Sequence, residues 1–329
     1  MSAEQNFDYP EVETYDKDGR RSLRELHNES YAQLLKKGWR ADPITSQKEE
    51  AKEETNNKPP LPIYAFLSPK HTPEPEPALW IIGGIHGEES APPNAFAQEI
   101  ETIASLPDIG IPVVAIFIAN PLGYSKDWRY PDLRRGMNLG HSIGDSDHLL
   151  PLLPINFLRF IPRKLKATSK ESDDFTKWVL KMGQIYKPLL VVNHHEDEID
   201  PDPKYPDRDV IYSYAYGTER ILDIICPMLS EILKKCGYKI KKDGKTRSGN
   251  ETVKDGFVRN ARDGSIDELL ASGEYIRNFK IIEKHAASAI FVVETIIHNE
   301  KPQSIAQRAS IHKEIIGYYP YLWKIVKES

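Results

Sequence analysis

Short apolar runs alternate with amphipathic stretches over most of the chain. The apolar runs are rich in β-branched and aromatic residues and predict strands at 63–68, 78–85, 111–120, 189–193, 210–216 and 289–294. Helical spacing of apolar positions predicts helices near 93–106, 172–186, 218–236 and from about 302. This alternation is typical of α/β proteins. Because several strands are apolar throughout, we expect a single domain with a mixed, mostly parallel sheet flanked by helices.

The first sixty residues follow a different pattern. Ser22 to Trp39 keeps a rough helical period, and Ser22 with Glu25 has the spacing of a capping box, so a short helix is expected there. Ile44 to Pro60 is charged and ends in two prolines, which is typical of a connector or exposed loop. We therefore expect an N-terminal extension at 1–60 and the α/β domain at 61–329.

Composition and charge exclude several classes of protein. The 329 residues are 40% hydrophobic and 28% charged, which suits a globular chain with its own core. Apolar runs fall short of the roughly 20 residues that span a bilayer, and a net charge of −5 favours no polyanionic partner. We expect neither a membrane nor nucleic acid as partner. The N-terminal residues lack the basic and apolar regions of a secretory signal, so we expect a cytoplasmic protein.

Metal-ligand side chains follow predicted strands at the edge where open α/β sheets bind ligands. The spacing His-x-x-Glu occurs three times, but only His86 and Glu89 follow an apolar strand through a Gly-Gly turn and precede a helix. His195, after a later strand, would complete two histidines and one carboxylate, which leaves a fourth zinc position open for water. The other two matches begin at His71 and at His195 itself. The pattern predicts one zinc ion per chain.

Glu294 ends a strongly apolar strand. An isolated carboxylate is costly to bury unless it is paired or lies near a cation, so a catalytic role explains this residue better than a structural one. Zinc lowers the pKa of its water towards about 7 and polarises a carbonyl, while a nearby carboxylate can accept the proton of that water. These residue types therefore predict hydrolysis of an amide bond.

The same segments resemble the zinc carboxypeptidase superfamily, which includes the succinylglutamate desuccinylase and aspartoacylase branch. GGIHGEE resembles the first zinc motif, NPLGYSKDWR resembles an Asn-Pro-x-Gly segment followed by an arginine, and VVNHHED resembles the strand with the third ligand. FVVETIIHNE resembles the strand that bears the catalytic glutamate. The likeness covers about Leu61 to the C-terminus in the family's order, and implies that 61–329 is a zinc metallohydrolase domain.

The resemblance implies a role for each matched residue. The zinc ligands would be His86, Glu89 and His195, with His195 favoured over His194 by its spacing from the strand. Glu294 would be the general base. Arg129 would stabilise the oxyanion, since a guanidinium stays protonated throughout the reaction.

The segment GMNLGHS departs from the peptidase pattern. Asn138 stands where those members have an acid behind the first zinc histidine, and His141 stands near their carboxylate-binding arginine. Histidine is only partly charged at neutral pH and cannot form a bidentate fork with a carboxylate. Arg135, with Arg134 beside it, or Arg259 could substitute and bind an anionic substrate. Tyr214 shares a strand face with its tyrosine neighbours, and is either a core residue or part of a substrate wall.

These features together predict a carboxypeptidase-like metallopeptidase that acts on a small peptide. Two alternatives stay open. One is an N-acyl amino acid deacylase of the aspartoacylase or desuccinylase kind. The other is a non-catalytic binding protein that has kept the fold, which the altered GMNLGHS segment would favour. The oligomeric state cannot be predicted from this pattern.

Overall fold

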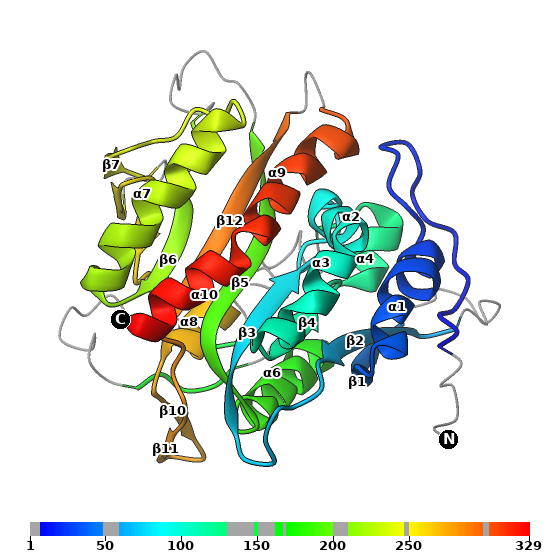
Figure 1. Cartoon of the computed structure of the whole chain (residues 1–329), viewed down its shortest axis with the longest axis horizontal. Coiled ribbons are helices and arrows are strands. Elements are labelled where there is room, and N and C mark those ends of the chain that lie inside the picture. The colour runs from blue at the N-terminus through cyan, green and yellow to red at the C-terminus, as the bar shows by residue number, and fades with distance from the viewer. Residues whose placement is uncertain are drawn as a thin grey trace.

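The computed structural model describes residues 7–48, 59–129, 148–150, 162–166, 169–199, 210–246, 250–298 and 303–329. Within these residues, ten strands form one sheet in the order β1-β2-β4-β3-β5-β12-β6-β9-β8-β7, and β10 pairs with β11 as a separate hairpin (Figure 1). The strands are β1 (Arg40–Gln47), β2 (Leu61–Leu67), β3 (Glu76–Gly83), β4 (Val113–Ile116), β5 (Tyr186–Ile199), β6 (Ser213–Gly217), β7 (Gly244–Lys245), β8 (Thr252–Lys254), β9 (Phe257–Arg259), β10 (Glu274–Arg277), β11 (Lys280–Glu283) and β12 (Ala289–His298).

The parallel part of the sheet is its centre. Strands β4, β3, β5 and β12 run parallel to one another, and antiparallel strands continue the sheet on both sides, with β2 beside β4 and β6 beside β12. The central strands are buried on both faces, which matches their continuous apolar sequence. The prediction of a mixed sheet flanked by helices in one α/β domain is confirmed. The expectation of a mostly parallel sheet holds only for its centre, because five of the nine strand pairings within the described sheet are antiparallel.

Helices cover both faces of the sheet. One apolar core lies under α1 (Ala32–Lys36), α2 (Ala91–Gln98), α3 (Ile100–Ser105), α4 (Pro121–Lys126), α7 (Glu219–Lys235), α9 (Ile305–Gly317) and α10 (Tyr319–Glu328). The second core lies on the other face under α6 (Lys170–Met182) and α8 (Ile266–Ala271). Side chains alternate between these cores along each strand, so the face to which a residue points follows from its position in the strand.

The N-terminal residues pack into the same core as the sheet. Glu25–Tyr31 forms a π-helical turn that continues into α1, and the predicted capping box is present, because Ser22 and Glu25 exchange backbone-to-side-chain hydrogen bonds. Tyr31 is fully buried against the first core. The prediction of a loop from Ile44 is wrong for its first residues, since β1 pairs antiparallel with β2 as an edge strand. Polar side chains are tolerated at such an edge, which hides the strand pattern.

Two of the predicted strands are longer than their apolar runs. β5 continues beyond the apolar run to Ile199, and β12 continues beyond Glu294 to His298. The two strands pair in parallel register over this whole length, from Ala289 opposite Leu190 to His298 opposite Ile199. The polar residues predicted to follow these strands therefore lie within them, where backbone pairing fixes their positions.

Two buried histidines predict that the fold loses stability in acid. Burial lowers the pKa of His27 to about 4, and burial together with the nearby Arg308 lowers that of His312 to about 3. The unfolded chain, with histidine pKa values near about 6.5, binds more protons than the folded chain below that pH, so the free energy of unfolding falls as the pH drops from about 6.5 towards 4. Each histidine contributes up to about 1.4 kcal/mol per pH unit. Urea unfolding at pH 7 and pH 5 measures the loss, and equal midpoints with equal m-values would contradict this expectation.

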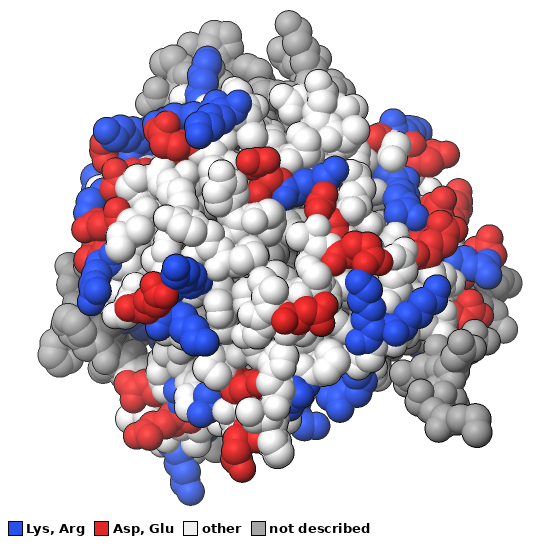
Figure 2. All heavy atoms as spheres, in the orientation of Figure 1, with Lys and Arg blue, Asp and Glu red and all other residues white. Residues whose placement is uncertain are grey.

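The surface seen in Figure 2 carries lysine and arginine side chains interspersed with aspartate and glutamate, without a large patch of one sign. None of the helices in the described part of the chain combines the length and the apolar character needed to cross a bilayer.

Candidate metal centre

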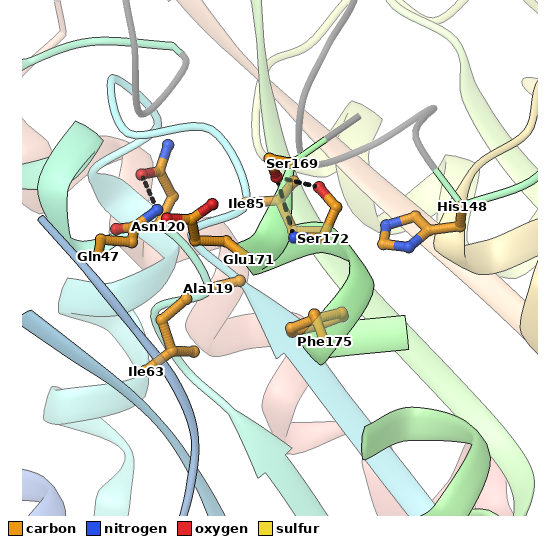
Figure 3. Close-up of a pocket in the computed structure, with 10 residues that line it drawn as sticks. All are labelled: Gln47, Ile63, Ile85, Ala119, Asn120, His148, Ser169, Glu171, Ser172 and Phe175. Carbon is orange, nitrogen blue, oxygen red and sulfur yellow. Dashed lines mark hydrogen bonds between the residues drawn. The ribbon is translucent and has the colours of Figure 1, made fainter. Parts of the chain in front are cut away.

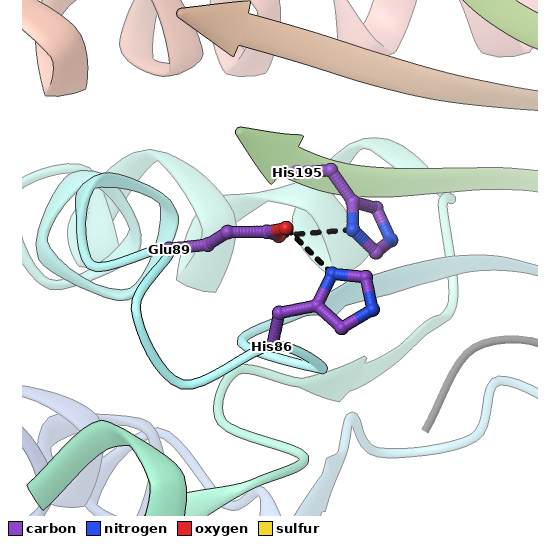
Figure 4. A group of neighbouring side chains, drawn as sticks. All are labelled: His86, Glu89 and His195. Carbon is purple, nitrogen blue, oxygen red and sulfur yellow. Dashed lines mark hydrogen bonds and ion pairs between the residues drawn. The ribbon is translucent and has the colours of Figure 1, made fainter. Parts of the chain in front are cut away.

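The loop between β3 and α2 brings two of the predicted ligands together. Gly84 has a φ of +60°, a left-handed conformation that glycine adopts without strain, and its backbone turns the chain away from β3. His86 then places its Nδ1 2.5 Å from Oε1 of Glu89. Nδ1 of His195, from β5, lies 2.9 Å from the other Glu89 oxygen (Figure 4).

This group of three side chains has the geometry of a metal site. Ligand atoms from His86, Glu89 and His195 all lie within 4.8 Å of one another, and all three residues are buried. Burial raises the pKa of Glu89, but the adjacent His86 and His195 outweigh it and hold this pKa well below its usual range, so the carboxyl group is ionised. Two imidazoles and one carboxylate, with room for a further ligand, are the donor set of many catalytic zinc sites.

His194, the alternative third ligand, lies on the other face of the sheet. It points into the first core, where Nδ1 lies 2.9 Å from Nδ1 of His312 and Nε2 lies 2.6 Å from the hydroxyl of Tyr319. His195 faces the opposite way because successive side chains of a strand alternate. The structure therefore brings His195, and not His194, to His86 and Glu89.

Glu294 lies beside His195 of β5. In the parallel pairing of β12 with β5, Glu294 is directly opposite His195, so both side chains emerge from the same face of the sheet. Glu294 is only partly buried. Its backbone N–H donates to the hydroxyl of Ser213 at 3.2 Å, which fixes this part of β12 against β6.

Arg129 reaches the same site from the segment after α4. Its Nη1 donates to Oε1 of Glu88 at 2.7 Å and lies 3.3 Å from Oε1 of Glu89. The Arg129 side chain is 42% exposed, so the guanidinium sits at the mouth of the site. Burial and the charge of Glu89 raise the pKa of Glu88, whereas Arg129 and His86 lower it. The sequence interpretation assigned no role to Glu88, although its place between the two loop ligands could have suggested one.

Gly87 allows this loop to touch α4 through backbone atoms alone. A Cβ atom at Gly87 would lie 2.0 Å from the carbonyl carbon of Gly123 and 2.3 Å from the carbonyl oxygen of Trp128. Such contacts are far shorter than van der Waals distance, so any side chain here must displace the backbone that carries His86 and Glu89.

We expect Gly87→Ala to lower the stability of the fold by about 1–3 kcal/mol, the usual cost of overpacking, and to weaken zinc binding because the ligand loop moves. Gly273→Ala is the matched control, since a Cβ there meets no atom within 4 Å. Urea unfolding and competition with a zinc chelator measure the two effects. Equal zinc affinity in the two variants would show that the loop does not depend on this close approach.

Other predicted substrate-binding residues are placed elsewhere or lie outside the described residues. Arg259 lies on β9 on the α7 face of the sheet, where it pairs with Glu219, Asp223 and Asp255, so the structure does not bring it to the metal-ligand group. Val258, its neighbour in β9, points into the second core, so Arg259 points to the opposite face of the sheet. Arg134, Arg135, Asn138 and His141 lie outside the described residues.

Tyr214 occupies the face of the sheet that also carries Glu294. It lies opposite Val292 in the pairing of β6 with β12, and its ring packs edge-on to that of Tyr212 with centroids 6.1 Å apart. Burial raises the pKa of Tyr214, and the nearby charges of Tyr212, Glu251 and Glu294 add to the rise. Tyr214 therefore contributes both to the second core and to the surroundings of Glu294.

A pocket lies next to the ligand loop (Figure 3). Ile85, the residue before His86, forms part of its wall, and so does Asn120, whose side chain donates to the backbone oxygen of Arg129 at 3.2 Å. The remaining wall is Gln47, Ile63, Ala119, His148, Ser169, Glu171, Ser172 and Phe175. His71, which begins another of the His-x-x-Glu matches, lies instead in an exposed loop.

Comparisons with solved structures agree with this architecture. No family model matches the chain, and no curated protein matches its sequence. A candidate metallopeptidase from Shewanella baltica is 18% identical, with a TM-score of 0.60 over 89% of this chain and 89% of its own. A second, from Shewanella amazonensis, is 18% identical, with a TM-score of 0.59 over 88% and 91%. Carboxypeptidase A from Helicoverpa armigera is 10% identical, with a TM-score of 0.52 over 97% and 76%.

At such low identities, these matches establish a shared fold. The chain shares its α/β fold, a large mixed sheet flanked by helices, with these two Shewanella structures. More particularly, the chain shares this fold with carboxypeptidase A from Helicoverpa armigera, so the fold that the sequence resemblance implied is present.

Proposed function

We propose that this protein is a zinc-dependent amide-bond hydrolase, and specifically a carboxypeptidase-like metallopeptidase that acts on a small peptide. The observation that carries the proposal is the buried group of His86, Glu89 and His195, whose ligand atoms lie within 4.8 Å of one another. Glu294 faces the same side from the neighbouring strand. Each chain would hold one zinc ion between these three ligands.

Zinc bound there would supply a Lewis acid and a water molecule that ionises near neutral pH. Glu294 accepts a proton from the attacking water and returns it to the leaving amine, because it is the partly exposed carboxylate opposite His195. Arg129 binds the negative charge that develops on the carbonyl oxygen, from its place 3.3 Å from Glu89 at the mouth of the site. Glu88 holds that guanidinium in place through a hydrogen bond of 2.7 Å.

The proposal also covers partners and place of action. We expect a small substrate, no nucleic acid and no membrane partner, and a cytoplasmic location. A net charge of −5 and the mixing of both signs over the face in Figure 2 support the expectation of no nucleic-acid partner, because polyanions bind to extended basic surfaces.

A substrate comparison tests the proposed activity. The zinc-loaded protein is offered a set of short unblocked and N-blocked peptides, and a set of N-acetyl and N-succinyl amino acids, with Glu294→Gln as the background control. Release of the C-terminal amino acid from peptides is the expected result. Cleavage of the acyl amino acids alone would replace the peptidase by an N-acyl amino acid deacylase. Stoichiometric zinc without hydrolysis of either set would favour a binding protein that has kept the fold.

A further inference from the structure

A buried ion pair lies directly behind the candidate metal centre, on the opposite face of the sheet. Glu196, the residue after His195, accepts a hydrogen bond of 2.6 Å from Nη1 of Arg308 on α9. The Glu196 side chain is 0% exposed and that of Arg308 is 5% exposed. Burying two charges costs several kcal/mol per ion before their attraction offsets it, so such a pair is weak support for stability and calls for another explanation.

The contacts of Glu196 supply that explanation. Its Oε2 accepts a hydrogen bond of 2.8 Å from the backbone N–H of Ala91. Ala91 is the first residue of α2 and lies two residues beyond Glu89. Its Oε1 lies 3.4 Å from the hydroxyl of Thr295, the residue after Glu294. This single carboxylate therefore touches the helix that follows the ligand loop and the strand that bears the base, while it belongs to the strand that bears His195.

Arg308 extends the connection to the ligand loop itself. Its Nη2 lies 3.4 Å from the hydroxyl of Ser90, which is next to Glu89 and fully buried. Ser90 in turn donates to Asp18 at 3.0 Å, in the N-terminal segment. Negative charge at the first turn of a helix is also favourable, so the carboxylate of Glu196 suits its place at the start of α2.

We propose that Glu196 and Arg308 form a positioning pair that holds the ligand loop, the strand of His195 and the strand of Glu294 in one fixed arrangement. The inference rests on the proposed function, because the arrangement matters only if these residues bind metal and act on substrate. Outer groups that orient metal ligands typically change metal affinity by about 10- to 100-fold when they are removed. An effect of that size is expected here.

The test compares two double variants in the full-length protein. Glu196→Gln with Arg308→Met removes both charges together, so that neither is left buried alone. Glu268→Gln with Arg163→Met is the matched control. Glu268 also pairs with a buried arginine, Arg163, and accepts a hydrogen bond from a backbone N–H, that of Gly264, but it does not adjoin a predicted ligand. Zinc affinity is measured by competition with a chelator, and the visible absorption spectrum of the cobalt-loaded protein reports ligand geometry.

The expected result for Glu196→Gln, Arg308→Met is a roughly 10- to 100-fold loss of zinc affinity and a changed cobalt spectrum. The control variant should keep the zinc affinity and the cobalt spectrum of the wild-type protein. Arg308→Lys, which keeps the charge, should retain more affinity than the double variant and serves if that variant does not fold. If the wild-type protein binds zinc and a folded Glu196→Gln, Arg308→Met variant binds it equally well, the positioning pair is refuted. That result leaves the proposed function intact. A wild-type protein that binds no zinc would overturn the proposed function and this inference with it.

Discussion

Replacing Glu294 by glutamine is expected to leave zinc bound and to lower kcat by about 10²- to 10⁴-fold, the range that a positioned acid or base contributes. Glutamine keeps the shape of the side chain but cannot accept the proton. Because Glu294 lies beside His195 rather than among the three ligand atoms that converge, its replacement should spare the metal. Zinc content and the rate of peptide hydrolysis are measured on the same sample.

The control for this variant is Glu283→Gln, which changes an exposed glutamate on the β10–β11 hairpin. It should keep both zinc and full activity. If Glu294→Gln retained wild-type activity, Glu294 would not be the base. If it instead lost zinc, Glu294 would belong to the ligand set.

Replacing His195 by alanine is expected to weaken zinc binding by more than the roughly 100-fold that outer groups contribute, because it removes one of three ligands. The neighbouring histidine provides a sharp contrast. His194→Asn should keep zinc but lower the free energy of unfolding by about 1–3 kcal/mol, since Tyr319 and His312 lose their buried partner. Chelator competition and urea unfolding are measured for both variants. Loss of zinc in His194→Asn with retention in His195→Ala would reverse the assignment.

The positions of the candidate site residues could be anticipated because they follow from strand geometry. The parallel strands β3, β5 and β12 are neighbours, so His86, just beyond β3, comes close to His195 and Glu294, which lie opposite each other within β5 and β12. Because side chains alternate along β5, His195 and His194 point to opposite faces of the sheet. The apolar run alone did not show which histidine points to which face. Their chemical roles remain predictions.

Other parts of the fold give weak signals in the sequence. β1 is a polar edge strand and resembles a loop, because only one of its edges is paired and apolar residues are not required. Arg259 was expected near the substrate, but its strand was not recognised, and a residue's face cannot be assigned without its strand. It instead neutralises Glu219, Asp223 and Asp255 beside α7.

The pair of Glu196 and Arg308 could not have been predicted, because its members lie 112 residues apart on a strand and a helix whose packing was unknown. A partial signal was available. Glu196 continues an apolar strand and, by alternation, points away from His195 into the core, where an acidic residue needs a cationic partner. Contacts of this kind depend on how α9 crosses the sheet (Figure 1), which local sequence does not specify.

Diffraction from crystals of the zinc-loaded protein, collected on both sides of the zinc absorption edge, tests the central claim most directly. We predict one anomalous peak per chain, about 2.0–2.2 Å from a nitrogen of His86, a nitrogen of His195 and an oxygen of Glu89, with Glu294 facing the remaining coordination position. A zinc ion bound by other residues, or no anomalous peak between these three side chains at saturating zinc, would contradict the account.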